Sequence, residues 1–387
     1  MWITRHSENL LRRMAGQFPA VIVTGARQTG KTSILRRMYP QASFLSLDLP
    51  ANAEAALTAP EQLLEQYPEP VIIDEIQYAP SLLRHLKYRI DRNRSSGRYF
   101  LTGSQVFQLM QGVSESLAGR CAVLSLNTLS RAELLDAGLP IEETSYIFQG
   151  GYPELHVGAE AVLWFPAYVA TYLERDVRNI LRVVELRDFN RFIRACALRT
   201  SQVLNYSDIA RDVGIEPNTA RKWLSLLQTS AVIALIEPYW GNRTKRLIKA
   251  PKLVFLDTGL AAFLAGFRSE DELFASSLVG AFWESHVFGQ IVRQSASGGD
   301  ASVVHYWRTA NGAEVDLVIE QAGGMALAVE CKWKEHPDST DAAGLRALEA
   351  VEKGRIKEKF IVCRTKAVYK LADGTWVMNM TQFLERK

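Results

Sequence analysis

Short apolar runs alternate with amphipathic stretches through the first third of the chain. The runs have the length and composition of buried strands, whereas stretches such as Ser33–Met38 and Ser81–Asp91 carry apolar residues at helical spacing. Alternation of this kind predicts a parallel sheet with helices on its faces. The expected strands are Ala20–Thr24, Phe44–Leu47, Val71–Ile73, Tyr99–Thr102 and Ala122–Leu126.

The pattern changes twice further along the chain. From Ser130 to Asn205 it is mostly helical, and Tyr206–Leu235 reads as three short helical pieces. Glu237–Leu256 is typical of a hairpin turning at Gly241-Asn242. A helix at Phe282–Arg293 then precedes a second set of strands, which predicts a second α/β unit. These strands are Val303–Arg308, Glu314–Ile319, Ala326–Glu330 and Phe360–Cys363.

Composition narrows the class of protein. The 387 residues have room for two or three domains of ~100–200 residues each. A hydrophobic fraction of 48% and a net charge of +3 describe an ordinary globular chain, so any nucleic-acid surface must be local. Four cysteines without a CxxC pair indicate neither a disulfide framework nor a zinc cluster. Without a signal peptide or a run of ~18 apolar residues, we expect a cytoplasmic protein with no membrane span.

Residues Gly25–Thr32 match the G-x-x-x-x-G-K-[ST] pattern of a phosphate-binding loop. The glycines let successive backbone N–H groups face the phosphates, and the following helix offers its positive N-terminus. Lys31 is expected to reach the β- and γ-phosphates of ATP, and the Thr32 hydroxyl to bind Mg²⁺. The alternative is a glycine turn with an incidental lysine, which the apolar strand running into the loop disfavours. The expected nucleotide contacts are Gly25, Ala26, Arg27, Gln28, Thr29, Gly30, Lys31, Thr32 and Ser33.

Polar residues end the next two buried strands. Asp74 and Glu75 follow Val71–Ile73, and a parallel sheet delivers them to the edge that carries the glycine-rich loop. Asp74 is then expected to hold the magnesium shell and Glu75 to polarise the attacking water. A solvated acidic turn is the alternative. Thr102 or Ser104, at the end of a third strand, could position water at the same edge, although Thr-Gly-Ser is also an ordinary turn.

The order of these parts resembles the AAA+ ATPases. Ser104 falls where that family places its first sensor residue. Arg120 occupies the position of an arginine that, in that family, completes the active site of a neighbouring subunit, so the resemblance implies a homo-oligomer. A surface arginine after a helix-ending glycine fits the sequence equally well. Arg175 and Arg178 are candidates for a second sensor.

The stretch Asn205–Leu224 has the rhythm of a helix-turn-helix. Ser207 is expected to cap the first helix, Gly214 to make the turn and Pro217 to open the second helix. The exposed face of that second helix would then present basic residues to phosphates or bases.

The segment that follows, residues 241–252, contains several bases and no acid, and it resembles the basic wing of a winged helix. Many winged helices bind proteins rather than DNA, and a solvated basic hairpin remains an alternative. The residues expected to contact DNA are Arg221, Lys222, Arg243, Lys245 and Arg246.

Carboxylates in the last apolar strands form a further candidate site. Glu284, Asp316, Glu330 and Lys332 resemble the PD-(D/E)xK nuclease core. The period of two along a strand puts Glu330 and Lys332 on one face, and a neighbouring strand could bring Asp316 beside them. The resemblance implies that the carboxylates bind Mg²⁺ and that the lysine activates water. The alternative is a Glu330–Lys332 ion pair in a module that only binds or scaffolds.

Taken end to end, the chain resembles a prokaryotic family of AAA+ ATPases fused to domain of unknown function 4143. The predicted class is α/β, with an ATPase core in 1–129, a helical lid in 130–200, a winged helix in 201–257 and a restriction-endonuclease-like domain in 258–387. The resemblance implies ATP binding and hydrolysis but supplies no substrate. We therefore expect an ATPase coupled to a winged helix and a nuclease-like region that acts on DNA, or alternatively a nucleotide-dependent protein-binding switch with an inactive nuclease-like domain. It is carried by Gly25–Thr32, Val71–Gln77, Leu101–Gln105, Glu115–Arg120, Tyr172–Val177, Lys252–Leu260 and Val315–Lys332.

Overall fold

The computed structural model of the chain describes residues 1–103, 116–173, 186–239, 250–300 and 302–387. Its N-terminal part is built on a five-stranded parallel sheet in the order β2-β3-β4-β1-β5. Each predicted strand agrees with an observed one to within one residue at either end, which confirms the parallel α/β unit. The strands are β1 Ala20–Thr24, β2 Ser43–Ser46, β3 Val71–Asp74, β4 Tyr99–Gly103 and β5 Cys121–Ser125.

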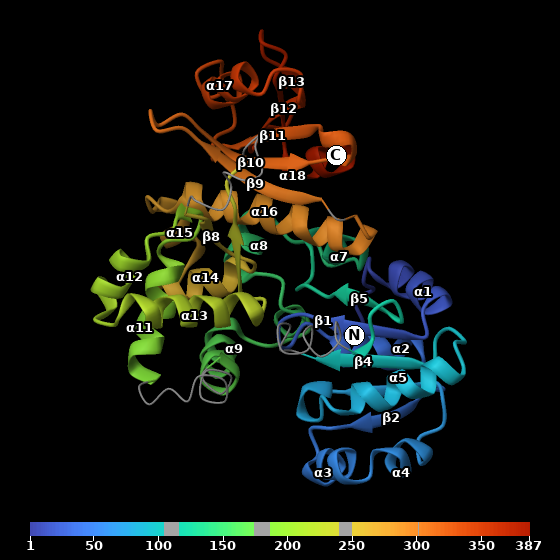
Figure 1. The fold of residues 1–387 in the computed structure, drawn as a ribbon. Coiled ribbons are helices and arrows are strands. Elements are labelled where there is room, and N and C mark those ends of the chain that lie inside the picture. Colours follow the sequence, from blue (N-terminus) through green and yellow to red (C-terminus); the bar gives the residue numbers. More distant parts are fainter. Residues whose placement is uncertain (104–115, 174–185, 240–249, 301) are drawn as a thin grey trace.

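Helices cover both faces of this sheet (Figure 1). Successive side chains of β1 enter opposite apolar cores, as the two-residue period of a strand requires. Ala20 and Ile22 pack with α3, α4 and α5, whereas Val21 and Val23 pack with α1 and α2. The central strands β1, β3 and β4 are therefore largely buried on both sides, whereas the edge strands β2 and β5 keep exposed residues such as Phe44 and Val123. The helices are α1 Glu8–Gln17, α2 Lys31–Met38, α3 Pro50–Thr58, α4 Pro60–Glu65 and α5 Leu82–Arg92, with a 3₁₀ turn η1 at Ile76–Tyr78.

The next part of the chain is helical, as the pattern predicts. Its helices are α7 Arg131–Asp136, α8 Glu143–Gln149, α9 Ala161–Tyr168 and α11 Leu186–Ala197, with a 3₁₀ helix η2 at Pro153–His156 and a π-helix η3 at Val169–Leu173. Ser130 opens α7 with a capping box, in which its hydroxyl accepts from the Glu133 N–H and the Glu133 carboxylate accepts from the Ser130 N–H.

Two helices and a small antiparallel sheet follow. Gly214 ends the first helix with φ of 84°, and Pro217 opens the second, as predicted. The cap of the first helix is Asn205 rather than Ser207, because the Asn205 amide oxygen accepts from two backbone N–H groups. The predicted third helical piece is wrong, since β7 is a wholly apolar strand that pairs with β8. The elements are α12 Tyr206–Val213, α13 Pro217–Thr229, β6 Gln202–Val203, β7 Ile233–Ile236 and β8 Lys252–Phe255, in sheet order β6-β8-β7.

A six-stranded mixed sheet, in the order β13-β14-β12-β11-β10-β9, closes the chain. The predicted strands correspond to β9–β12, while β13 at the edge of the sheet and its neighbour β14 have two and three residues and escape prediction. The strands are β9 Val303–Arg308, β10 Glu314–Glu320, β11 Ala326–Cys331, β12 Ile356–Val362, β13 Tyr369–Lys370 and β14 Trp376–Met378. The helices are α14 Thr258–Ala265, α15 Glu270–Ala275, α16 Val279–Gly298, α17 Ala343–Val351 and α18 Met380–Arg386, with a turn η5 at Ala322–Gly324.

Helix α16 has 20 residues and is buried along most of its length. Figure 1 shows it crossing the middle of the molecule, with the C-terminal sheet on one side and α7, α8 and α14 on the other. One apolar cluster extends from α8 through α13 to α18. It crosses the predicted boundaries after residues 200 and 257, so these boundaries do not coincide with a break in the core. None of the helices in the described part of the chain is long and apolar enough to cross a membrane.

Candidate nucleotide site and C-terminal carboxylate cluster

The glycine-rich loop, Gly25–Thr32, connects the end of β1 to the start of α2. Gly25 has φ of 139°, and a Cβ at this position would lie 2.2 Å from the Leu126 carbonyl oxygen. Gly30 has φ of 89° and precedes the first residue of α2. Only glycine meets both requirements without strain or a backbone clash. The first N–H groups of α2 have no partner within the helix, so the loop ends on a site that suits an anion.

Lys31 lies back over the loop. Its side chain is buried, and Nζ donates to the carbonyl oxygens of Gly25 at 3.1 Å and Ala26 at 2.8 Å. Carbonyl dipoles orient an ammonium but do not neutralise its charge. The loop therefore combines a fixed cation with the positive end of a helix.

Thr32, Asp74 and Thr102 meet at the edge of the sheet where the loop lies. The Thr32 hydroxyl donates to Asp74 Oδ1 at 2.5 Å, and the Thr102 hydroxyl donates to the same oxygen at 2.6 Å. Thr102 Oγ1 also accepts from the Glu75 N–H at 3.0 Å. One buried hydroxyl thus fixes the side chain of Asp74 and the backbone of Glu75 together.

Glu75 has an unusual backbone conformation, with φ of 57° in the left-handed region. A non-glycine residue held there costs about 1–3 kcal/mol, and such residues concentrate at functional sites. Its carboxylate accepts from the Gln77 side-chain amide. Sequence reasoning identified Glu75 but gave no indication of Gln77 as its partner.

Of the predicted sensor residues and the arginine expected to act on a neighbouring subunit, only that arginine, Arg120, is described by the structure. Ser104, Arg175 and Arg178 lie outside the described residues. Arg120 lies just before β5, at the opposite edge of the sheet from the loop, and Nε donates to Asp91 at 2.6 Å while Nη2 donates at 3.1 Å. These hydrogen bonds lower the pKa of Asp91 to about 2. The proposed action of Arg120 on a neighbouring subunit stays a prediction.

Arg5 braces the glycine-rich loop from the N-terminal segment. It is buried, and its guanidinium donates to the Thr29 carbonyl at 2.9 Å, the Asn127 carbonyl at 2.6 Å and Glu133 Oε1 at 3.1 Å. Burial would raise the pKa of Glu133, but the Arg5 charge and backbone N–H donors outweigh it and lower the pKa. No sequence pattern marked Arg5, because its partners lie up to 128 residues away.

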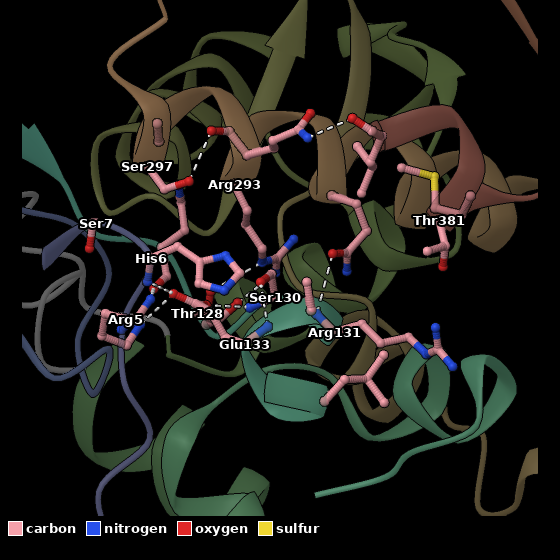
Figure 2. Close-up of a pocket in the computed structure, with 18 of the residues that line it drawn as sticks. Arg5, His6, Ser7, Thr128, Ser130, Arg131, Glu133, Arg293, Ser297 and Thr381 are labelled. Atoms are coloured by element: carbon pink, nitrogen blue, oxygen red, sulfur yellow. Dashed lines mark hydrogen bonds and ion pairs between the residues drawn. The ribbon is translucent and has the colours of Figure 1, made fainter. Parts of the chain in front are cut away.

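A cavity of about 240 Å³ lies beside Arg5. Figure 2 shows Arg5, Thr128 and Glu133 close together on one side of it and Thr381 of α18 on the other. Its walls come from the N-terminal segment, the end of β5, α7, α16 and α18. The cavity therefore lies where the five-stranded unit meets the C-terminal part of the chain.

A buried carboxylate, Asp257, joins the same two parts. Asp257 Oδ2 accepts from the Thr128 hydroxyl at 3.0 Å and from the Gly151 N–H at 2.9 Å. Arg293 of α16 lies 3.7 Å from this oxygen and donates to Thr128 Oγ1 at 2.5 Å and to the Leu256 carbonyl at 2.7 Å. Because every donor here is buried, the network fixes α14 and α16 against the end of β5.

The second helix of the α12–α13 pair presents an exposed polar face. Arg221 and Lys222 are exposed, whereas Ala220, Trp223 and Leu224 are buried against α11 and α12. The Arg221 guanidinium lies 5.0 Å from the Tyr206 ring. The other three predicted DNA contacts, Arg243, Lys245 and Arg246, fall outside the described residues.

At the C-terminal carboxylates, a lysine that the sequence placed in the basic wing takes a different position. Lys252 of β8 is 1% exposed. Its Nζ lies 2.8 Å from Glu284 Oε1, 2.8 Å from Glu314 Oε1 and 4.0 Å from Asp316 Oδ1. Burial would lower the pKa of Lys252, but the carboxylates, Glu284 first among them, outweigh it and raise the pKa. The ammonium therefore stays charged inside the cluster and is not available to DNA.

Glu330 and Lys332 form the second part of the cluster. Lys332 Nζ donates to Glu330 Oε1 at 2.6 Å, as the two-residue spacing predicts. Burial raises the pKa of Glu330 to about 8, and the charge of Asp316 adds to this shift. Asp316 Oδ2 accepts from the Cys331 N–H at 2.8 Å. Glu284, Asp316, Glu330 and Lys332 thus do gather at one place, with Lys252 and Glu314 as members that sequence reasoning missed.

Comparison with known families divides the chain into three consecutive matches. An AAA domain matches residues 17–135, a domain of unknown function (DUF8612) matches residues 142–271, and another domain of unknown function (DUF4143) matches residues 279–383. The glycine-rich loop, Asp74 and Glu75 all fall within the first match, and the carboxylate cluster, apart from Lys252, within the third.

Two relatives match most of the chain. The uncharacterized proteins Rv2008c of Mycobacterium tuberculosis and Mb2031c of Mycobacterium bovis are each 30% identical over 317 residues, which is 81% of this chain and 70% of theirs. Among solved structures, a Walker-type ATPase of Pyrococcus abyssi aligns with 68% of this chain and 96% of its own at 16% identity and a TM-score of 0.46. A likeness that slight supports no inference about function.

Proposed function

This chain belongs to the family of the mycobacterial proteins Rv2008c and Mb2031c, and we propose that it binds and hydrolyses ATP with Mg²⁺ at the glycine-rich loop. One observation carries the proposal. The Thr32 hydroxyl and the Asp74 carboxylate, 42 residues apart, lie 2.5 Å from each other beside the loop in a segment that matches an AAA domain. A hydroxyl and a carboxylate at this place are what a nucleotide-bound magnesium ion requires.

The donor set fits the proposed cofactor. Thr32 and Asp74 offer hard oxygen ligands, which Mg²⁺ prefers, and the loop N–H groups with Lys31 offer donors to phosphate. Magnesium would neutralise charge that develops on the phosphates. Within the chain, Lys31 would leave the Gly25 and Ala26 carbonyls for a phosphate oxygen, and Glu75, held by Thr102, would accept a proton from water.

The experiment that tests ATP binding compares wild type with Lys31→Ala. Removing one partner of a desolvated charge pair costs about 2–5 kcal/mol, so we expect the ATP affinity to fall by at least about 30-fold. Lys87→Ala is the matched control, because Lys87 is a half-exposed lysine on α5 that pairs with Asp91. Titration calorimetry with MgATP gives both affinities. If folded Lys31→Ala bound ATP with the affinity of wild type, the glycine-rich loop would not be the ATP-binding site.

A continuous set of contacts supports coupling between this site and the C-terminal part. Arg5 connects Thr29 of the loop to Asn127. The adjacent residue, Thr128, accepts from Arg293 of α16. We propose that nucleotide binding at the loop alters the position of α16 along this path.

For the C-terminal part we propose two alternative roles. In the first, α12 and α13 form a winged helix that binds DNA, and Glu284, Asp316, Glu330 and Lys332 act as a nuclease. In the second, the chain is a nucleotide-dependent binding switch and the nuclease-like unit is inactive. The Glu330–Lys332 contact favours the second role, because the Lys332 ammonium lies 2.6 Å from Glu330 Oε1 and competes with a metal for that oxygen.

Replacing the two exposed basic residues of α13, Arg221 and Lys222, tests DNA binding. The double variant Arg221→Glu, Lys222→Glu is expected to weaken binding to duplex DNA. It should also reduce the slope of log affinity against log salt by about 1 for each phosphate that the variant no longer neutralises. The control Arg12→Glu, Arg13→Glu changes the net charge equally on the exposed side of α1. If both double variants lower the affinity and the slope to the same extent, α13 does not contact DNA and the effect is one of net charge.

A further inference from the structure

The carboxylate cluster contains its own cation. Glu284 comes from α16, Glu314 and Asp316 come from β10, and the Lys252 ammonium lies among all three with 1% of the residue exposed. The lysine belongs to β8, which is part of the separate three-stranded sheet. Two of its three distances are those of direct, charge-assisted hydrogen bonds.

A divalent metal does not fit beside this ammonium. Magnesium needs carboxylate oxygens at about 2.0–2.1 Å and keeps several waters, whereas the Glu284 and Glu314 oxygens that would serve already contact Nζ at 2.8 Å. A second cation there would face the lysine charge at short range in a buried site. Within the part of the chain that is described, no group of three His, Cys, Asp or Glu side chains is arranged to hold a metal ion.

We propose that Lys252 is the resident cation of this cluster, that it occupies the place of a divalent metal, and that lysine and metal exclude one another. The inference goes beyond the ATPase function and does not depend on it. As long as β8 keeps Lys252 in contact with Glu284 and Glu314, the nuclease-like unit would contain no metal in this cluster. The ion pairs of Lys252 then form a charged connection between the three-stranded sheet and the C-terminal sheet, beside backbone contacts such as the one from the Tyr239 N–H to the Tyr306 carbonyl.

A second observation shows that the cluster has an unused ligand position. Glu330 Oε2 is buried and has no hydrogen-bond partner among the residues that the structure describes, although buried carboxylate oxygens almost always have one. Glu330 is close enough to Asp316 and Lys252 for their charges to shift its pKa. Without the lysine charge, this oxygen and those of Glu284, Glu314 and Asp316 would turn toward an added cation, an arrangement that they do not have while Lys252 lies among them.

The experiment measures Mn²⁺ binding to the full chain without nucleotide, by the electron paramagnetic resonance signal of free Mn²⁺. Wild type and Asp316→Asn are expected to bind Mn²⁺ equally. Lys252→Met, which keeps the side-chain length but removes the charge, is expected to bind at least one additional Mn²⁺ per chain, at least about tenfold more tightly than any site that wild type shows. The additional site should disappear in Lys252→Met, Asp316→Asn. Mn²⁺ should raise the melting temperature of Lys252→Met and leave that of wild type unchanged.

Two results would overturn the proposal. If wild type binds Mn²⁺ at a site that Asp316→Asn removes, the lysine does not exclude a metal, and this comparison holds even if Lys252→Met fails to fold. If folded Lys252→Met binds no more Mn²⁺ than wild type, the carboxylates do not form a cation site. If wild type proved not to bind ATP, that result would contradict the proposed ATPase function but not this proposal, because the Mn²⁺ titrations contain no nucleotide.

Discussion

Glu75→Gln is expected to lower the rate of ATP hydrolysis by 10²–10⁴-fold, in the range typical of a removed general base, while ATP affinity stays within about threefold of wild type. Glutamine keeps the length of the side chain and can still bond to Gln77, but it cannot accept a proton from water. The left-handed backbone of Glu75 is held by the Thr102 hydroxyl and is preserved in the variant. Steady-state phosphate release and MgATP titration give the two quantities separately.

The control for this prediction is Glu54→Gln, an exposed glutamate on α3, which should leave both quantities unchanged. Thr102→Val is a useful second variant, since it removes the hydroxyl that holds Asp74 and Glu75 without changing either carboxylate. Equal hydrolysis rates in wild type and Glu75→Gln would contradict the role of Glu75 and make Asp74 the next carboxylate to be tested.

Asp257→Ala is expected to reduce the free energy of unfolding by about 3–5 kcal/mol, because it leaves the buried Arg293 charge and several N–H and O–H donors without their acceptor. The loss should be largest where the carboxylate acts, in α14 and α16. Urea denaturation measures the change in free energy, and hydrogen exchange of the backbone amides locates it.

The matched control is Asp48→Ala, at an exposed position after β2, where a change within about 0.5 kcal/mol is expected. Asp257→Asn should fall between the two, since its amide oxygen can still accept from Thr128 or Gly151 but carries no charge for Arg293. A loss below about 1 kcal/mol in Asp257→Ala would show that the network does not hold the two parts of the chain together.

The N-terminal sheet could be predicted because its signals are local. Continuous apolar runs bounded by polar residues determine a strand buried on both faces, and β1 and β4 follow this pattern throughout. The stretch Val232–Ile236 shows the limit of the same reasoning. An apolar run this short is compatible with either a buried helix or a strand, and its pairing with β8 decides for the strand.

The residues of the candidate sites also fall into those that a local sequence pattern predicts and those that depend on distant partners. The loop spacing, Asp74, Glu75 and the Glu330–Lys332 pair are consequences of local sequence or of strand period, and the structure brings each set together. Arg5, Asp257 and Lys252 act through partners that are distant in sequence, so no spacing marks them. Lys252 at the start of the apolar strand Lys252–Phe255 was a usable signal of a different kind, because a buried ammonium requires carboxylate partners elsewhere in the chain.

The origin of Lys252 in β8 bears on how the protein is divided for experiments. A fragment that starts at residue 279, where the match to the third family begins, would contain Glu284, Glu314, Asp316 and Glu330 but not the lysine that balances them. Such a fragment would carry excess negative charge in its interior and would recruit cations that the whole chain excludes. Metal affinity or cleavage measured on the excised piece would then report on the point at which the chain was cut.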